Sequence, residues 1–574
     1  MTSTTTRYES LLLGAALLLA ILTYFYGLGD VGIPSNGDEN VYIHIARKTL
    51  ESGHWLPLAT DIEHVRNTKP PLLFWQGMSS TDYGSQWTLW RLRFPNALYS
   101  VATAALLFAL LWRLQKQWRS AAVAALLYLG FYSTYRYGRP FLTNAPETFW
   151  LTVPGVAVLW TRGRLLDSRY FVPALFGIAV GIACLYKSFA LVVPFSLTLA
   201  GWNLERHGYR VRESLTHGVP AVLIAGVTAL AIFALWPLLD PDPSAIWHDF
   251  VLRENAGKFD SSAGLVNYLG SFFWGSWSVW SLFGALLANG GLLAPILLAL
   301  IIQAWRRRHS LTMEERLLWI WVIAYFVAFS IPSQRSGRYL LAAMPALAAL
   351  GALAWSRIHR AGPMTVAVVA TLLALGFGFF SVLLIHQTGG DLALPVEFWL
   401  VIACVLILGA SSIIVPRLQG STTLLFPILL SLAMGISLNA YARFPGPYTA
   451  ATRDRVHGES VFVPCNFLAA EEAHRFLLPG ADIRSYAEGD GLSLNELAAH
   501  YRFFAAFVPL DHPSVCDGCQ VIDARYVVRG RHTATTAGHA TIGELAQDFF
   551  EREVLFESTR APDEPPPFEE ACAR

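Results

Sequence analysis

The sequence predicts an α-helical polytopic membrane protein with about thirteen transmembrane helices, amphipathic helices in its external loops and a small C-terminal α/β domain. Of its 574 residues, 54% are hydrophobic and 14% are charged, whereas a soluble protein carries about 25% charged residues. The apolar residues come in blocks of bilayer length, such as "LLLGAALLLAILTYFYGL" and "VAVVATLLALGFGFFSVLLI". The net charge of +1, without a basic run interleaved with aromatic residues, argues against nucleic-acid binding.

Thirteen apolar segments are predicted to cross the membrane. The first lacks a small-residue cleavage site, so it is expected to be retained as a helix. Lys187 separates the fifth segment from the sixth, and both are kept because losing one would reverse every later segment against the basic clusters. The predicted spans are residues 9–28, 96–112, 120–136, 146–161, 170–186, 188–203, 217–238, 279–304, 317–332, 339–356, 363–385, 397–415 and 421–441.

The positions of lysine and arginine predict the orientation in a cell inner (plasma) membrane, because basic loops stay in the cytoplasm. An odd number of spans then places the N-terminus in the cytoplasm and the tail on the external, periplasmic side. Residues 1–441 are predicted as the transmembrane domain, with long external loops at 29–95 and 239–278, and residues 442–574 as an external domain. The basic clusters are residues 113–119, 162–169, 205–212, 306–309 and 357–360.

The tail mixes strand-like runs ("ESVFVP", "ARYVVRG") with a helix-like run ("NELAAHYRFFAAF"), which predicts a small α/β domain. It contains Cys465, Cys516, Cys519 and Cys572, and an external compartment favours disulfides. The "CDGC" motif either closes a tight loop or pairs with Cys465. A metal or redox role is the alternative, for which His512 is the nearest additional ligand.

The first external loop contains a predicted amphipathic helix over residues 38–52, suited to lying along the membrane surface. Asn36 is expected as its N-cap and Gly53 as its stop. Asp38 and Glu39 occupy its first turn, where they either complement the helix dipole or carry chemistry. The apolar face is predicted to consist of Tyr42, Ile45, Ala46, Thr49 and Leu50, with His44, Arg47 or Lys48, and Glu51 elsewhere.

A second motif in the same loop is "NTKPPLLFWQ". Its two prolines can start a helix but cannot continue one, so a second surface helix is expected there, with residues 72–75 facing lipid. Lys69 would sit at the start of this helix, at the same interface as Asp38. It is either a snorkelling anchor or a functional cation, and sharing a loop with a carboxylate pair favours function.

The motifs "GDENVYIHIARKTLESGHW" and "TKPPLLFWQ" resemble the membrane glycosyltransferases of family 39. This family includes the protein O-mannosyltransferases and the lipid A aminoarabinose transferases, and has the GT-C fold. The resemblance continues through the weaker motifs "NAPETFWL", "WHDFVLRENAGKF" and "SQRSGRYLLAAMPALAAL", the last of which ends at residue 350. Thirteen spans and an external tail also fit the plan of the aminoarabinose transferases.

The resemblance implies that a sugar moves from a polyprenyl-phosphate donor to an acceptor at the external face of the membrane. Asp38 matches the catalytic carboxylate of the family and would act as general base in a single, inverting displacement, with Glu39 as the neighbouring candidate. Lys69 would bind the donor phosphate, followed by Arg338 with Tyr339, because cations must meet the charge of the leaving phosphate.

Four further positions are weaker candidates. Arg139 lies at a predicted external helix end and would either hold phosphate or anchor the helix. Glu254, Asn255 and Lys258 fall where relatives carry an acid and a polar residue in the second external loop, although a solvated helix face explains them equally well.

Two departures from the family pattern argue against a metal ion. Many relatives have an acid where this chain has Thr68, and an aspartate where it has Asn144. Glu147 either substitutes for the missing aspartate or starts a helix after Pro146. We therefore expect no metal and no other cofactor.

The sugar and the acceptor stay open: lipid A, an envelope glycan and a protein all fit, besides contacts with membrane lipids. The rival functions are a multi-pass transporter or flippase and a non-catalytic scaffold for envelope assembly. Transporters place ionisable residues near the bilayer midplane and often contain repeated halves. This chain has no visible repeat and only Lys187 as a mid-span candidate, which favours the enzyme.

Overall fold

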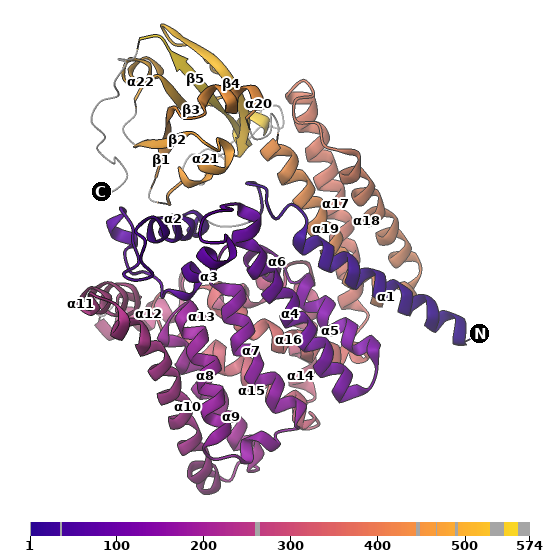
Figure 1. Ribbon diagram of the computed structural model, residues 1–574. Coiled ribbons are helices and arrows are strands. Elements are labelled where there is room, and N and C mark those ends of the chain that lie inside the picture. The colour runs from indigo at the N-terminus through magenta and orange to yellow at the C-terminus, as the bar shows by residue number, and fades with distance from the viewer. Residues whose placement is uncertain are drawn as a thin grey trace.

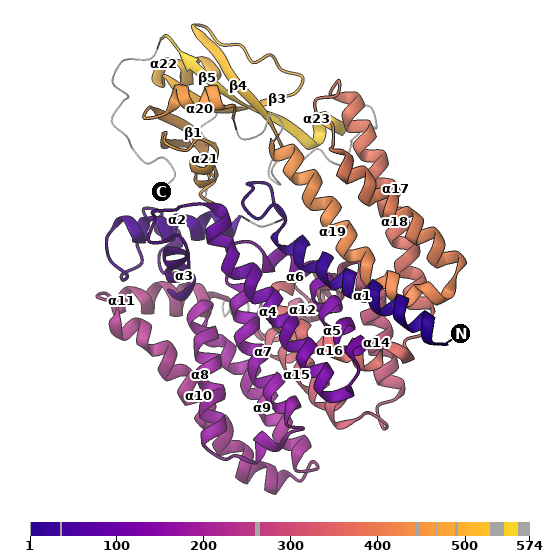
Figure 2. The same ribbon diagram turned by 45° about the vertical axis from the view of Figure 1, so that its right-hand side comes forward.

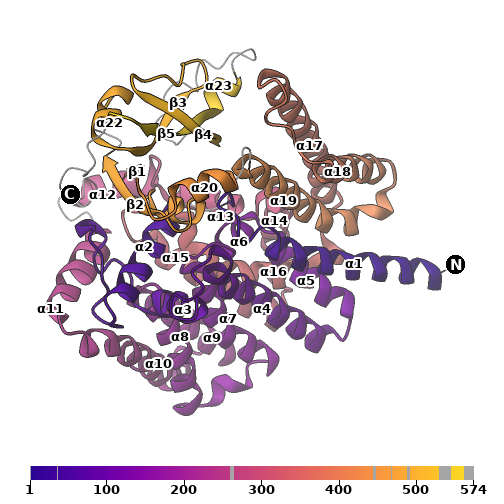
Figure 3. The same ribbon diagram turned by 45° about the horizontal axis from the view of Figure 1, so that its top comes forward.

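The protein consists of a large helical body with a small sheet packed on one end of it, as the computed structural model shows (Figure 1). The helices α2 (Asp38–Glu51) and α3 (Leu72–Ser80) lie between the body and the sheet (Figures 1 and 2). Viewed with the sheet side forward, α1 (Thr2–Phe25) extends away from the body toward the N-terminus (Figure 3). The structure describes residues 2–34, 37–258, 264–443, 448–466, 468–487, 492–528 and 545–560.

Helices lie at all thirteen predicted spans. The first half of the body contains α4 (Leu89–Gln115), α5 (Trp118–Gly130), α6 (Tyr132–Gly138), α7 (Asn144–Trp160), α8 (Phe171–Tyr186), α9 (Val192–Arg206), α10 (Val211–Leu239) and α11 (Pro243–Ile246). The second half contains α12 (Gly264–Phe273), α13 (Val279–Asn289), α14 (Ala294–Arg306), α15 (Met313–Ser330), α16 (Met344–Ala354), α17 (Ala361–Gln387), α18 (Val396–Ile414) and α19 (Gln419–Arg443).

Six helices of the described residues are long and apolar enough to cross a membrane, or seven if one bent pair counts as a single span. The protein is therefore a multi-pass membrane protein, and the number thirteen stays a prediction. The predicted span 279–304 is the bent pair: α13 and α14 meet at 108°. The chain turns there at Gly291, whose φ of +56° suits glycine, and where a Cβ would meet Tyr132 at 2.5 Å.

The core of the body is organised around two helices that are apolar on every side. All residues of α5 from Ala121 to Gly130 are buried, as are nearly all residues of α16, which is the pattern of a fully enclosed helix. On the flank, Gly177 and Gly181 of α8 allow α10 to approach closely: a Cβ at Gly177 would meet Ala225 O at 2.6 Å. Small residues four apart are the usual means of close helix contact in membranes.

The C-terminal region forms the predicted α/β fold. Its five-stranded sheet has the order β2-β1-β3-β5-β4, with β1 parallel to β2 and β3, and β5 antiparallel to β3 and β4. Two buried apolar clusters centre on this region. The strands are β1 (Ser460–Cys465), β2 (Asp482–Ala487), β3 (Phe503–Pro509), β4 (Cys519–Val528) and β5 (Phe550–Ser558). The helices are α20 (Ala450–Val456), α21 (Glu472–Leu477), α22 (Leu494–His500) and α23 (Leu545–Phe549).

A disulfide joins Cys516 to Cys519, so the "CDGC" motif closes a tight loop before β4. Cys572 lies outside the described residues, and the boundaries of the predicted domains stay a prediction.

The first loop folds into two short helices, as predicted, but neither is a free surface helix. Leu73 and Phe74 of α3 were expected to face lipid; instead, both are fully buried in a cluster shared with α2. His44, expected off the apolar face of α2, is also buried. The reason is that α3 packs against α2 and α4, whereas Glu472 of the C-terminal region covers His44. Gly37 is the N-cap of α2 and Gly53 follows its end with a φ of +72°, while Asn36 lies outside the described residues.

Candidate active site

A cavity of about 650 Å³ opens beside the first turn of α2, where the long loops meet the helical body. Five segments enclose it: the first loop, the turn before α7, the break after α8 with the start of α9, the π-helix η4 (Trp247–Asn255) with the 3-10 helix η5 (Ala256–Lys258), and the stretch from the end of α15 to the 3-10 helix η7 (Gly337–Ala343). Its charged and polar lining residues are Asp38, Tyr42, Lys69, Thr143, Lys187, Ser188, Glu254, Asn255, Lys258, Gln334, Ser336, Arg338 and Tyr339.

Asp38 and Arg338 meet across this cavity, 300 residues apart in the chain. Arg338 Nη1 donates to Asp38 Oδ2 at 2.6 Å, and its Nη2 donates to Asn144 Oδ1 at 3.3 Å. The guanidinium also lies over the ring of Tyr137, 5.2 Å from its centre. The Asp38 side chain retains 37% of its exposure, so the carboxylate is held but still open to a ligand.

Lys69 and the second long loop form the next group. Lys69 Nζ donates to Glu254 Oε1 at 2.9 Å, and Lys258 Nζ donates to the same oxygen at 3.1 Å. Burial alone would raise the pKa of Glu254, but the two ammonium groups outweigh it and the pKa is lowered. Glu254 is therefore a carboxylate that holds two lysines at the cavity wall. Glu254, Asn255 and Lys258, the weaker candidates of the second loop, thus line the same cavity as Lys69, and their role in the site stays a prediction.

Lys187, which interrupts two apolar spans in the sequence and was the mid-span candidate of the transporter alternative, lines the cavity. It caps the C-terminal end of α8 at a break before η3 (Phe189–Leu191) and donates to Glu147 Oε2 at 2.7 Å. Its ammonium lies 5.8 Å from the ring centre of Tyr339. Glu147 is thus the buried partner of a lysine rather than only a helix-starting residue. The signal was present, because a lysine between two apolar spans is a functional candidate by default.

Asn255 supports the same break. Ser188 Oγ donates to Asn255 Oδ1 at 2.7 Å, and Asn255 Nδ2 donates to Phe250 O at 2.7 Å. This amide therefore ties the π-helix to the segment that carries Lys187.

The charge balance of the lining favours an anion. Lys69, Lys187, Lys258 and Arg338 bring four positive charges, Asp38 and Glu254 bring two negative ones, and Glu147, bound to Lys187, brings a third, a difference of +1. Away from these groups the wall is apolar, with Leu191, Val193, Pro194, Phe250, Val251, Ala328, Phe329, Ile331 and Pro332. A ligand with an anionic head and a hydrocarbon chain matches both parts of the cavity.

Two predicted site residues do not line the cavity. Glu39 points away from Asp38 into the protein, where both of its oxygens bind Arg93, at 2.7 and 3.0 Å, and one accepts the Phe141 N–H at 2.7 Å. Arg139 is buried against the end of α1, where its guanidinium binds the carbonyl oxygens of Tyr24 and Tyr26. The predicted catalytic role of Glu39 therefore needs correction, and of the two roles predicted for Arg139 the structure favours the anchor over phosphate binding: both side chains join structural elements and do not face the cavity.

The positions where relatives were expected to carry metal-binding acids hold neutral side chains with partners of their own. Thr68 Oγ1 donates to Val65 O at 2.9 Å, and Asn144 accepts from Arg338. Within the described residues, three candidate metal ligands converge only at His44, Glu471 and Glu472, outside the cavity. The absence of a cofactor stays a prediction.

The fold is similar to that of a solved bacterial protein. A crystal structure of ArnT from Cupriavidus metallidurans bound to undecaprenyl phosphate superposes with a TM-score of 0.59, covering 97% of this chain and 100% of that one at 16% identity. The apo structure of the same protein gives a TM-score of 0.58. The protein is therefore a polytopic membrane protein whose overall fold is similar to that of this neighbour.

Sequence comparison finds relatives over part of the chain. Residues 36–247 match the family model described as dolichyl-phosphate-mannose-protein mannosyltransferase. An undecaprenyl phosphate-alpha-4-amino-4-deoxy-L-arabinose arabinosyl transferase of Sodalis glossinidius is 27% identical over 348 residues, which cover 59% of this chain and 58% of that relative. The enzyme of the same name from Pectobacterium carotovorum is 26% identical, with 63% and 64% covered. The chain is similar to these proteins, and the matched stretches cover less than two thirds of the length of either relative.

Proposed function

We propose that the protein is an integral-membrane glycosyltransferase that moves a sugar from a polyprenyl-phosphate donor to an acceptor in the cell envelope. The observation that best supports this proposal is that Asp38 shares one cavity with four cationic side chains and an apolar wall. A general base, a phosphate site and a lipid site are the three parts that this reaction requires. The named functions of the relatives and the undecaprenyl phosphate bound by the Cupriavidus protein support the same class of donor.

The donor phosphate would compete with Asp38 for Arg338. In the free protein Arg338 binds the Asp38 carboxylate at 2.6 Å, which occupies one of its oxygens. A phosphate held by Lys69, Lys187 and Arg338 draws the guanidinium toward itself and releases that carboxylate for the acceptor. Cations fixed in a partly dry cavity stabilise the developing phosphate charge far better than water does.

The transfer itself is a single displacement. Asp38 takes the proton of the acceptor hydroxyl, the acceptor oxygen forms the new bond to the anomeric carbon, and the bond to the phosphate oxygen breaks. The electron pair of that bond leaves with the polyprenyl phosphate, whose charge the lysines and Arg338 meet. Attack opposite to the leaving group inverts the anomeric configuration.

We place the reaction at the external face of an inner membrane, with the N-terminus in the cytoplasm and the C-terminal region in the periplasm. The basic clusters of the predicted cytoplasmic loops support this orientation. The names of the relatives favour an aminoarabinose-like pentose and a lipid A acceptor, whereas the matching family model favours a mannose and a protein. A metal ion has no role in the proposed steps.

Reconstitution tests this proposal. The purified protein in liposomes receives a radiolabelled polyprenyl-phosphate sugar and, separately, lipid A or an envelope glycan or protein extract. We expect transfer with inversion, which NMR of the product detects, and a loss of turnover of about 10²–10⁴-fold for Asp38→Asn. The control Asp82→Asn changes an exposed acid that bonds Ser85 in the same loop, and it should behave as the parent. A parent that moves intact donor across the bilayer without transfer would instead be a flippase.

A further inference from the structure

A segment of the C-terminal region packs directly against the helix that carries Asp38. Ala469 is fully buried in the apolar cluster of the first loop, and Leu468 and Phe476 pack against the same cluster. Leu468 also touches the N-cap of α2, where a Cβ added to Gly37 would collide with it. Residues 468–476 therefore complete the core of the catalytic loop, although they lie about 430 residues later in the chain.

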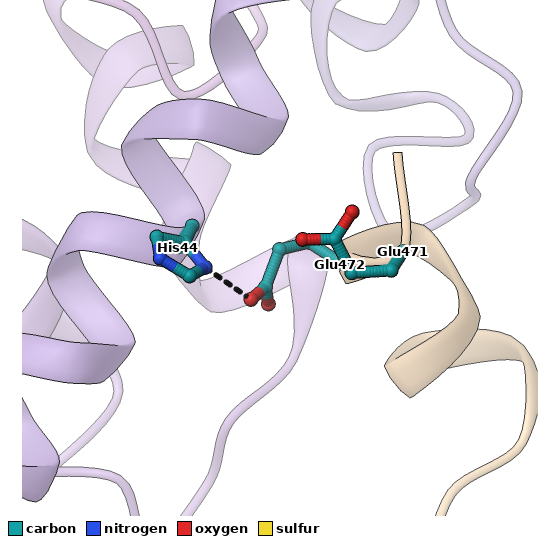
Figure 4. Close-up of side chains that lie close together, drawn as sticks. All are labelled: His44, Glu471 and Glu472. Atoms are coloured by element: carbon teal, nitrogen blue, oxygen red, sulfur yellow. Dashed lines mark hydrogen bonds and ion pairs between the residues drawn. The ribbon is translucent and has the colours of Figure 1, made fainter. Parts of the chain in front are cut away.

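Glu472, the first residue of α21, binds His44 of α2 (Figure 4) and also Arg47 of the same helix. Its Oε1 lies 2.9 Å from His44 Nδ1, and its carboxylate accepts three bonds from the Arg47 guanidinium, at 2.5, 3.2 and 3.2 Å. His44 Nε2 in turn lies 2.6 Å from Asp61 Oδ1 in the loop after α2. The side chains of Glu472 and His44 retain 0% and 3% of their exposure. Charge-assisted bonds of this kind, including bonds from an Arg fork, are the strong and directional ones.

The balance of charges shows that this junction is an ion-pair network and not a cation site. Glu471 and Glu472 lie near His44 (Figure 4), which is the composition of a metal site. However, Arg47 already occupies the Glu472 carboxylate, and Arg475 lies 3.5 Å from it. A metal ion would have to displace a fixed guanidinium and bind beside a second one.

The protonation of these groups agrees with a closed network. Burial alone would lower the pKa of His44, but its bonds with Asp61 and Glu472 outweigh burial and raise the pKa to about 9. Burial alone would raise the pKa of Glu472, but His44 and Arg47 bring it down to about 2. At neutral pH both groups are therefore charged and attract each other. Arg475 of α21, Glu471 at the N-cap of α21 and Lys48 of α2 complete the charged groups that face this pair.

We propose that Glu472 is a positioning residue for the transfer reaction. It fixes α2 through Arg47 and His44, and so holds Asp38, two turns away on the same helix, against Arg338. This inference rests on the proposed function, since it assigns the C-terminal region a part in the same site. A displaced catalytic group is costly: an error of about 1 Å in its position can lower turnover about 100-fold.

The test compares Glu472→Gln with the matched control Glu557→Gln, which removes another ion-paired acid of the C-terminal region, bound to Arg455 and without contact to α2. We expect Glu472→Gln to lower kcat about 10- to 100-fold while KM for the donor stays near that of the parent. The backbone amides of residues 38–51 should exchange hydrogen faster. Glu557→Gln should leave both measurements unchanged.

Two further variants keep the test decisive. Arg47→Lys retains the charge but loses the fork geometry, so it should reproduce the defect even if Glu472→Gln does not accumulate. The double variant Arg47→Gln/Glu472→Gln should be closer to the parent than Glu472→Gln, because no charge is left buried without its partner. Parental kcat and parental exchange in Glu472→Gln would overturn the inference. If the parent itself transfers no sugar, the proposed function fails, and the exchange of α2 alone then decides whether Glu472 holds the helix.

Discussion

The two neighbouring carboxylates at the start of α2 belong to two different regions of the molecule. Asp38 faces the cavity, keeps 37% of its exposure and is held by one arginine bond. Glu39 faces the protein interior, keeps 4%, and has two bonds from Arg93 and one from the Phe141 N–H. A buried carboxylate whose two oxygens both accept fixed hydrogen bonds is not accessible to a substrate. A partly exposed carboxylate with one bonded oxygen can still accept a proton from a substrate. Position in the sequence does not separate these roles; the number of fixed partners does.

Replacing Glu39 should lower the stability of the protein, whereas replacing Asp38 should lower turnover and leave stability nearly unchanged. Glu39→Gln leaves the Arg93 guanidinium buried without a counter-charge, which costs about 3–5 kcal/mol of stability. We expect a clearly lower Tm in detergent, followed by dye binding or intrinsic fluorescence, and poor accumulation in the membrane. Asp38→Asn should melt near the parental temperature. Equal Tm values for the two variants would show that the contrast between the two regions is wrong.

A substitution of Lys69 tests the role of the cavity, and its effect on donor binding should be smaller than the effects above. A charge-assisted bond to a phosphate contributes about 1.5–3 kcal/mol, so Lys69→Ala should weaken donor binding and use about tenfold or more. Titration with the polyprenyl-phosphate donor measures this change. Lys116→Asn removes a lysine in a left-handed cap conformation that asparagine also adopts, far from the cavity, and should bind as the parent does. Donor affinity and turnover equal to those of the parent would remove Lys69 from the phosphate site.

The stability contributed by the junction between α2 and the C-terminal region should depend on pH. The pKa of His44 is raised from 6.5 to about 9 in the folded protein, so its contribution to stability is full below pH 6.5 and is lost as the pH rises toward 9. We expect Tm to fall over this window in the parent and to change much less in His44→Gln. The same slope in both proteins would assign the pH dependence to other groups.

Much of this arrangement follows from the sequence, and the remainder depends on contacts between distant segments. The helix over residues 38–51 and the second helix after Pro71 were predictable from local signals: a first turn of acids, a glycine stop and a double proline. Local sequence signals do not predict contacts between segments that are far apart in the chain. The joint location of Asp38, Lys69, Lys258 and Arg338 was therefore expected only through the family resemblance.

The burial of His44 could not be predicted from the helix itself. Its position off the apolar face indicates exposure to solvent, and only the α21 segment, which arrives from the end of the chain, covers it. The same is true of Glu147, whose role depends on a lysine 40 residues away. Ionisable residues with buried partners are the ones that sequence pattern assigns least well, since their neighbours come from tertiary packing.

Metal removal should have the smallest effect of all. The acids that would coordinate a divalent ion are replaced by Thr68 and Asn144, whose oxygens offer no negative charge, and Asn144 already accepts from Arg338. Arg338 and the lysines meet the phosphate charge that a divalent ion would otherwise neutralise. We therefore expect turnover after exhaustive treatment with EDTA to equal that of the untreated protein. Loss of turnover that added Mg²⁺ or Mn²⁺ restores would show that other carboxylates, with Glu254 the first candidate in the cavity, bind an ion with the donor.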